Sequence, residues 1–466
     1  MANRPSHALL PLTDLMFELE ETTIRQTQAA LDKGEISCKE LLASYLTRIK
    51  QFDEGLKSVI AVNPNAQGLV NGPLRGVPVL VKDNLETADM PTTAGSASLR
   101  GFCSGRDAAV VTRLRNAGAI VFGKLNLHEF AIWGETVSSI LGQTVNPYDH
   151  SRTPGGSSGG TGVAVSANFS LVGIGTDTVN SVRSPASACC LCGIRPTIGL
   201  VDGDGIVPYS LTQDTAGPLA RTVEDAVRVL EVIAGREYLQ YLKKDGLAEK
   251  RLGILGSFFG KGKDCRPVNT VMGSALSAME AAEAKLLVLP DLIDSTWLAS
   301  EVSVHLHELK AHLGEYLKSV SAPVQSIDDI LASGKYSPSI EANLISANKL
   351  SIKSPEYHQR MQLRKELQAT VIGMFERERL DAMIFPQQQQ LVCKIGESQK
   401  MRNGALGAIT GFPSIVVPTG FSPPTDKAPL GVPVGLEILG KPRDEGRLIE
   451  IAYAFEQATM VRRAPF

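Results

Sequence analysis

The sequence predicts an α/β fold, in which one α/β/α sandwich domain surrounds a mixed, largely parallel sheet. Short apolar runs of strand length alternate with amphipathic segments of helix length along most of the 466 residues. The composition, 43% hydrophobic and 21% charged, is typical of a globular protein. The chain contains neither a segment that resembles an interdomain linker nor an internal repeat. These observations together favour one large domain.

The N-terminal part predicts two helices followed by a β-α-β unit. Residues 22–33 are amphipathic and end at Gly34. Ser37 and Glu40 form a capping box, which predicts the start of a second helix that extends to about residue 51. The elements expected next are a strand at 58–62, a strand at 77–81, a helix at 107–117 and a strand at 120–122. This order favours parallel pairing.

The remainder of the chain repeats the alternation. A Gly/Ser-rich centre at 151–218 contains short apolar runs, and Thr222 caps a helix that ends at Gly235. The elements expected after it are strand 252–255, helix 267–285, strand 286–289, helix 354–380, strands 382–385, 414–417 and 434–439, and helix 447–458.

A lysine and two serines supply the parts of an acyl transfer without a histidine. Lys82 follows the apolar run Val77–Val81, Ser157 lies in a glycine-rich segment, and Ser181 lies in a second polar segment. A serine hydroxyl is a weak nucleophile unless a base takes its proton. Burial can keep a lysine neutral, because desolvation disfavours the charged form. Local sequence alone equally allows Lys82 to be a strand-end lysine that reaches water.

These segments resemble the amidase signature family. The match rests on residues 81–84, on the block 154–196 and on the spacing of Lys82, Ser157 and Ser181. Further matching segments are 90–96, 214–222 and 411–414, so the resemblance covers nearly the whole chain. It implies an amidase with no cofactor and no metal. Such an enzyme hydrolyses a carboxamide C–N bond through an acyl-enzyme and releases ammonia or an amine.

The resemblance also implies a role for each site residue. Ser181 would be the nucleophile, Ser157 the proton relay after a cis Gly156–Ser157 bond, and Lys82 the base. The expected oxyanion hole consists of the backbone N–H groups of Thr178, Val179, Asn180 and Ser181. The expected supporting residues are Asp177 and Arg183, which would pair across the nucleophile loop, and Ser158, which would hydrogen-bond Lys82.

One departure from the family concerns the residues before the nucleophile. The family usually has glycines where this chain has Val179 and Asn180. A β-branched valine adopts a left-handed backbone poorly. If the loop required a positive φ at Val179, the oxyanion hole would be strained, and both the turnover rate and the acyl groups admitted would change.

The expected domain covers residues 1–466. Its parts would be N-terminal helices at 1–60, a catalytic core with the triad at 61–235, a largely helical inserted portion at 236–380, and C-terminal strands and a helix at 381–466.

Two other functions stay open. One is the glutaminase subunit of a tRNA-dependent amidotransferase, which is similar to this family and works with partner chains. The other is a weakly active or non-catalytic member that binds an amide.

Three further motifs favour structural interpretations. A nucleophile elbow at Ser158 would need a later loop histidine, whereas the later histidines lie on expected helices. His307 and His312 are five residues apart, and a zinc helix requires four. Cys189, Cys190 and Cys192 lack a second cysteine pair, so we expect them in a buried core turn.

Composition limits the partners and the location. The net charge of −2 gives no reason to expect a nucleic-acid partner. Seven irregularly spaced cysteines predict reduced thiols in a cytoplasmic protein. The apolar runs are too short for a membrane helix or a signal peptide. We expect a small-molecule amide as the only ligand and allow a homodimer. Trp133 and Tyr148 are candidate apolar contacts of the substrate, with core packing as the alternative.

Overall fold

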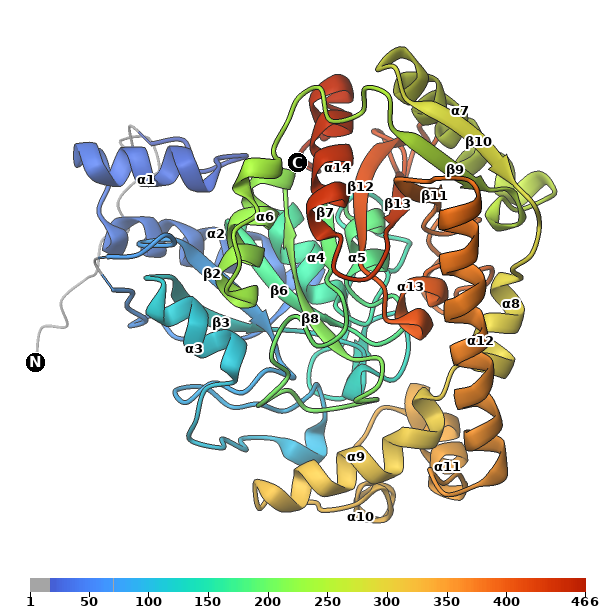
Figure 1. The fold of residues 1–466 in the computed structure, drawn as a ribbon. Helices are drawn as coiled ribbons and strands as arrows, with labels where there is room; N and C mark the ends of the chain where they lie inside the picture. The colour runs from blue at the N-terminus through green and yellow to red at the C-terminus, as the bar shows by residue number, and fades with distance from the viewer. Residues whose placement is uncertain (1–16, 70) are drawn as a thin grey trace, which may run out of the picture.

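The computed structural model describes residues 17–69 and 71–466, and it confirms the α/β fold with a mixed sheet. Eleven strands form one sheet in the order β1-β3-β2-β6-β8-β7-β12-β13-β11-β9-β10 (Figure 1). Their bounds are β1 Val59–Val62, β2 Pro78–Lys82, β3 Ile120–Leu125, β6 Val172–Asp177, β7 Cys192–Arg195, β8 Thr215–Ala220, β9 Arg251–Leu255, β10 Lys285–Leu289, β11 Ala382–Pro386, β12 Ser414–Phe421 and β13 Pro433–Leu439. Two short strands, β4 Val137–Ser138 and β5 Gly142–Gln143, form a separate hairpin.

Helices cover both faces of this sheet. Their bounds are α1 Ile24–Lys33, α2 Cys38–Leu56, α3 Ala109–Asn116, α4 Gly159–Ser166, α5 Arg183–Ala188, α6 Val223–Ala234, α7 Arg266–Ala281, α8 Ser295–Trp297, α9 His305–Ser319, α10 Ile327–Ser333, α11 Glu341–Lys349, α12 Pro355–Arg377, α13 Ala405–Thr410 and α14 Glu445–Thr459. Figure 1 shows α6 and α14 in front of the sheet, with α4 and α5 behind it. Helix α14 contacts α6 and α7, and α4 contacts α5, so each face has its own helical layer.

Parallel pairing occurs in two places along the sheet. Strand β2 pairs in parallel with β3 and β6, and β9 pairs in parallel with β10 and β11. The other neighbouring strands are antiparallel. The consequence for function is that β2 lies directly beside β6. The ends of these two strands carry Lys82 and Asp177, which the sequence separates widely.

Local signals predicted the element starts well. The Ser37–Glu40 capping box is formed, and its helix continues to Leu56 rather than ending near residue 51. Helix α1 ends at Gly34, which has a left-handed backbone with φ of 69°. The helices near the Gly/Ser-rich centre, α4 and α5, have only eight and six residues. Periodicity gives little signal over so few residues.

The region 236–380 contributes to the sheet before it becomes helical. Its strands β9 and β10 form the far edge of the sheet, and the helices from α8 to α12 follow them. Leucines and isoleucines of α9, α10 and α11 form an apolar cluster with Phe130 and Tyr209 of the preceding part of the chain. The division into four segments stays a prediction.

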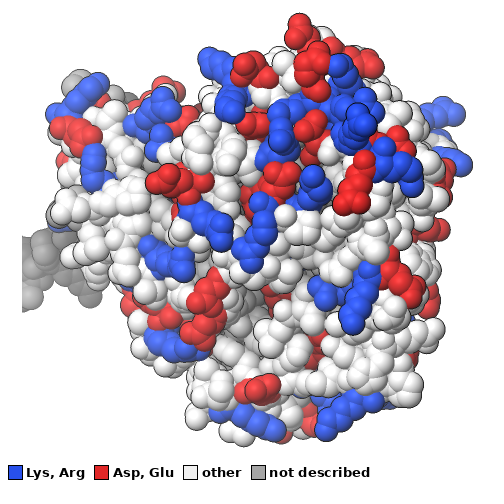
Figure 2. All heavy atoms as spheres, viewed as in Figure 1, with Lys and Arg blue, Asp and Glu red and all other residues white. Residues whose placement is uncertain are grey.

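The cysteine segment and the surface charge need one correction and one remark. Cys192 begins strand β7 instead of lying in a turn, and Cys189, Cys190 and Cys192 are all buried. Figure 2 shows acidic and basic side chains interspersed over the face in view. Of the helices within the described ranges, none combines the length and apolarity that crossing a bilayer requires.

Candidate active site

Lys82 is the last residue of β2, and its side chain is fully buried. Its Nζ lies 2.7 Å from Ser157 Oγ and 2.8 Å from Thr176 Oγ1. Burial lowers the pKa of Lys82 to about 7, against the opposing effects of the Asp177 and Asp214 carboxylates. About half of the amine is therefore neutral near pH 7 and able to accept a proton.

Ser157 lies on a tight backbone turn just before α4. The Gly156–Ser157 peptide bond is cis, as the resemblance implied. The Ser157 carbonyl accepts a 3.0 Å hydrogen bond from the backbone of His128. A Cβ on Gly156 would lie 2.6 Å from Thr136 Oγ1. Only glycine fits there, and the close contact orients the Ser157 side chain toward Lys82.

Ser181 lies in the loop between β6 and α5. Its carbonyl accepts a 3.2 Å hydrogen bond from the backbone N–H of Ser158, which places the loop beside the Ser157 turn. Ser181 is 5% exposed, whereas Ser157 and Lys82 are fully buried. Among the hydrogen bonds of the described residues, none is donated by the backbone N–H groups of 178–181. These donors are free to bind an oxyanion.

The nucleophile loop does not require the glycines that the family usually has. Neither Val179 nor Asn180 is among the described residues with a positive φ. The strain anticipated for a valine at this position is therefore absent. Val179 instead packs against an apolar cluster that includes Phe258 and Leu406.

A buried ionic network supports the loop from below. Arg183 Nη2 lies 3.1 Å from Asp177 Oδ1, which confirms the predicted pair, and Asp177 Oδ2 accepts the Val182 N–H at 2.9 Å. Arg195 adds a second cation 2.8 Å from Asp177, and Glu437 pairs with Arg183. Burial alone would raise the pKa of Asp177, but the two guanidinium groups hold it well below its ordinary value.

The expected bond between Ser158 and Lys82 is wrong. Ser158 Oγ donates to the Thr176 carbonyl at 3.1 Å and accepts the Thr176 N–H at 3.3 Å, so it joins α4 to β6. Thr176 Oγ1 contacts the lysine instead, and it also accepts a 3.1 Å hydrogen bond from Asn84. Thr176 is adjacent to Asp177 in sequence, but only the pairing of β2 with β6 shows that it faces Lys82.

Two other segments that reach the site gave only weak signals in the sequence. Gln388 of the short glutamine tract donates to Ser184 Oγ at 2.9 Å, one turn beyond the nucleophile. His128 contacts Ser157 through its backbone, and burial lowers the pKa of its ring to about 3. The imidazole is therefore neutral at physiological pH.

The two candidate aromatic contacts have different positions. Trp133 is 39% exposed and stacks on Arg402, whose guanidinium carbon lies 4.9 Å from the ring centroid. Arg402 contacts the position of a Cβ on Gly134, and Gly134 contacts that of Gly156, so Trp133 lies near the Ser157 turn. Tyr148 is buried against Phe421, with ring centroids 5.5 Å apart, and packs in the core.

The arrangement provides a buried amine, a hydroxyl within proton-transfer distance, and a nearby serine flanked by free N–H donors. These groups suit acyl transfer by a serine nucleophile. In residues 17–69 and 71–466, no group of three or more His, Cys, Asp or Glu side chains is placed to hold a metal ion.

The family assignment follows from comparison with known proteins. The family profile described as "Amidase" matches residues 40–449, most of the chain. This chain belongs to the amidase signature family. It is a hydrolase that acts on amide C–N bonds and has a small-molecule amide as its substrate.

Individual relatives of this amidase cover nearly its whole length. A protein named "Probable amidase" from Arabidopsis thaliana is 33% identical, covering 96% of this chain and 92% of the relative. A glutamyl-tRNA(Gln) amidotransferase subunit of Caldanaerobacter subterraneus is 30% identical, covering 95% and 97%. The crystal structure of peptide amidase from Stenotrophomonas maltophilia is 34% identical with a TM-score of 0.85, covering 96% and 99%.

Proposed function

We propose that this amidase works through an acyl-enzyme on Ser181, with Ser157 as the relay and Lys82 as the base. The observation that carries the proposal is the 2.7 Å contact between Lys82 Nζ and Ser157 Oγ in a fully buried setting. A neutral lysine accepts the Ser157 proton while Ser157 accepts the Ser181 proton. The Ser181 oxygen then bonds to the amide carbon, and the carbonyl electron pair moves to its oxygen.

The free N–H groups of residues 178–181 receive this oxyanion. The tetrahedral intermediate collapses, the C–N bond breaks, and Ser157 returns a proton to the leaving nitrogen. Water, deprotonated by the same Ser157–Lys82 pair, then attacks the ester carbon. The carboxylic acid leaves, and Ser181 regains its proton.

The decisive experiment is covalent labelling with a fluorophosphonate probe, followed by mass spectrometry of the labelled peptide. We expect one adduct on Ser181 that is lost in Ser181→Ala. Ser187→Ala is the matched control, since Ser187 lies in the adjacent helix α5 and retains the Ser181 site. An adduct on another serine, or an active Ser181→Ala enzyme, would reject this assignment.

The substrate class we propose is a peptide amide. The 34% identity to the peptide amidase, over nearly the full length of both chains, supports this class. The partly exposed Trp133 offers an apolar surface near the Ser157 turn. A panel of short aliphatic amides, aryl amides, fatty acyl amides, amino-acid amides and glutamine, scored for released ammonia, tests the class. Preference for a short aliphatic amide over every amino-acid amide would contradict it.

The glutaminase role is the second candidate, because the amidotransferase subunits are 30% identical over almost the whole chain. That role predicts strict dependence on glutamine and co-purification with partner chains. Release of ammonia from other amides by the isolated chain would exclude it. The non-catalytic alternative fails if the probe labels Ser181.

Location and assembly complete the proposal. All seven cysteines lie within the described residues and are unpaired, which supports a reducing compartment such as the cytoplasm. A homodimer stays a prediction, which light scattering of the purified protein tests. Nucleic acid is not expected as a partner, given the mixed surface charge in Figure 2.

A further inference from the structure

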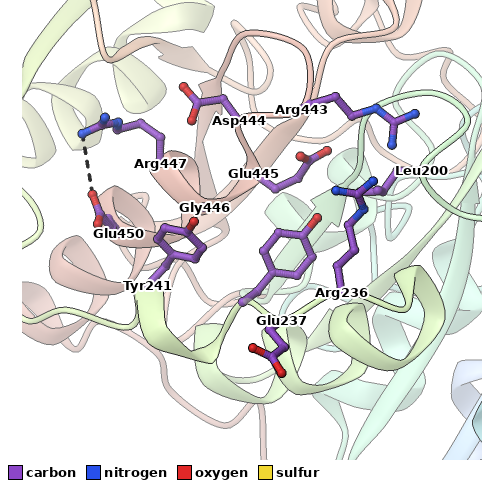
Figure 3. Close-up of a pocket in the computed structure, with 11 residues that line it drawn as sticks. Leu200, Arg236, Glu237, Tyr241, Arg443, Asp444, Glu445, Gly446, Arg447 and Glu450 are labelled. Atoms are coloured by element: carbon purple, nitrogen blue, oxygen red, sulfur yellow. Dashed lines mark ion pairs between the residues drawn. The ribbon is translucent and has the colours of Figure 1, made fainter.

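A second pocket, formed by residues outside the proposed triad and its loop, lies beside the start of α14. Figure 3 shows its lining side chains. The pocket has a volume of about 530 Å³. It lies where Leu200, the segment 236–241 and the start of α14 at 443–450 come together.

Two arginines in this pocket have no carboxylate partner among the described residues. Arg447 faces Glu450 and Asp381, and Glu450 also binds two lysines, so these charges are neutralised. Arg236 and Arg443 form no ion pair with any described residue. Figure 3 shows their guanidinium groups on the same side of the pocket, with the Glu445 carboxylate beside them. Two adjacent cations of this kind attract a carboxylate.

Two buried polar side chains complete the same corner. Glu445 is 2% exposed; its Oε1 accepts the Thr197 N–H at 2.8 Å, and its second oxygen has no described donor. Tyr238 is 7% exposed, and burial together with Glu445 raises its pKa to about 12, so its hydroxyl keeps a proton. That hydroxyl has no hydrogen-bond partner among the described residues. Arg236 and Arg443 both act on it electrostatically, which places it at the same corner.

We propose that this pocket binds a free α-amino acid with an apolar side chain. The carboxylate would lie between Arg236 and Arg443, whose forked donors match its geometry. The ammonium would face the Glu445 carboxylate, and the Tyr238 hydroxyl would donate to the ligand. The Glu445 charge argues against a dianion such as phosphate, because like charges at this distance repel.

Apolar surface is available on the other side of the pocket. The Tyr241 ring lies against the backbone of Gly446, where a Cβ would come within 2.6 Å of the ring. Leu200 adds a second apolar wall. A ligand with charged groups at one end and an aliphatic or aromatic side chain at the other fits this distribution.

Isothermal titration calorimetry of the full-length protein tests the proposal with L-leucine, L-phenylalanine and L-methionine. We expect at least one of them to bind with one-to-one stoichiometry. For L-leucine, 4-methylpentanoate lacks the ammonium and isoamylamine lacks the carboxylate; each should bind at least tenfold more weakly. Neither analogue has an amide bond, so the enzyme cannot hydrolyse it.

The variants locate the binding. Arg236→Gln, Arg443→Gln and Glu445→Gln should each weaken the amino acid at least tenfold, whereas Arg100→Gln, an exposed arginine outside the pocket, should not. Circular dichroism and amidase activity verify that each variant is folded. The proposal is overturned if none of the three amino acids binds, if inorganic phosphate binds more tightly than they do, or if folded Arg443→Gln binds them unchanged.

Discussion

Lys82 Nζ and Ser157 Oγ lie 2.7 Å apart in a region that solvent does not reach. Among the described residues the amine forms no ion pair, and its closest partners are the hydroxyls of Ser157 and Thr176. Burial without a paired carboxylate is what moves its pKa down to about 7. The protonation state of one side chain therefore sets the pH range of the enzyme.

The first prediction concerns the pH dependence of catalysis. The value of kcat/KM should rise with pH and reach half its maximum near pH 7, because only the neutral amine can accept a proton. Lys82→Arg should be inactive at every pH, since a guanidinium stays charged. Steady-state assays from pH 5.5 to 9, with circular dichroism to verify folding, provide the measurement. A flat profile across neutral pH would contradict the role of Lys82.

The second prediction concerns stability. The folded pKa of Lys82 lies below its unfolded value, so the unfolded state binds the extra proton between about pH 7 and pH 10.5. Wild-type stability should therefore rise with pH across this window. Lys82→Met should raise the free energy of unfolding at pH 7 by a few kcal/mol, because each pH unit between the two pKa values corresponds to about 1.4 kcal/mol. Urea titrations should show the gain shrinking toward pH 10.

The third prediction concerns the ionic network below the nucleophile. Arg183→Gln leaves Glu437 buried without its cation, which should destabilise the protein by about 3–5 kcal/mol. Arg25→Gln is the control, because its ion pair with Glu224 is exposed and should contribute about 0–1 kcal/mol. Urea unfolding measures both. Equal effects of the two variants would show that the network does not stabilise the fold.

The fourth prediction concerns the residue that departs from the family. Because Val179 has no positive φ, Val179→Gly should not increase kcat. It should lower stability, by about 1 kcal/mol from backbone entropy and by a further loss of apolar contacts. Steady-state kinetics on a single amide and a thermal melt measure the two effects. A several-fold increase in kcat would mean that the valine restrains the oxyanion hole after all.

The fifth prediction compares two helical glycines. A Cβ on Gly160 in α4 would collide with the Asn126 backbone, whereas Gly273 in α7 has no atom within 4 Å of that position. Gly160→Ala should lower stability by several kcal/mol and reduce activity, because α4 carries the Ser157 turn. Gly273→Ala should raise stability by about 0.5–1 kcal/mol. Thermal melts of both variants test this, and similar melting temperatures would contradict it.

How far the sequence predicts this structure depends on whether a signal is local. The capping box at Ser37–Glu40 and the helix stop at Gly34 were predicted correctly, since each involves neighbouring residues. The partner of Lys82 was predicted wrongly as Ser158. The choice between Ser158 and Thr176 depends on which strand lies beside β2, and the order of strands in a sheet is not encoded in any short segment.

The same limit applies to the second pocket. Its walls come from around residues 200, 236–241 and 443–450, which only the packing of α14 against α6 brings together. None of these segments has a motif by itself. The conformation of Val179 was likewise inaccessible, because the same loop sequence is compatible with more than one backbone path.

The glycines around Ser157 have a consequence for how new specificity can arise. Gly156, Gly159 and Gly160 are packed so closely against neighbouring backbone and Thr136 that no larger residue fits at any of them. Mutational libraries aimed at this half of the catalytic centre should yield mostly unfolded protein. Divergence toward other amides is left to the opposite rim, where Trp133 and Arg402 can be exchanged without moving the reacting groups.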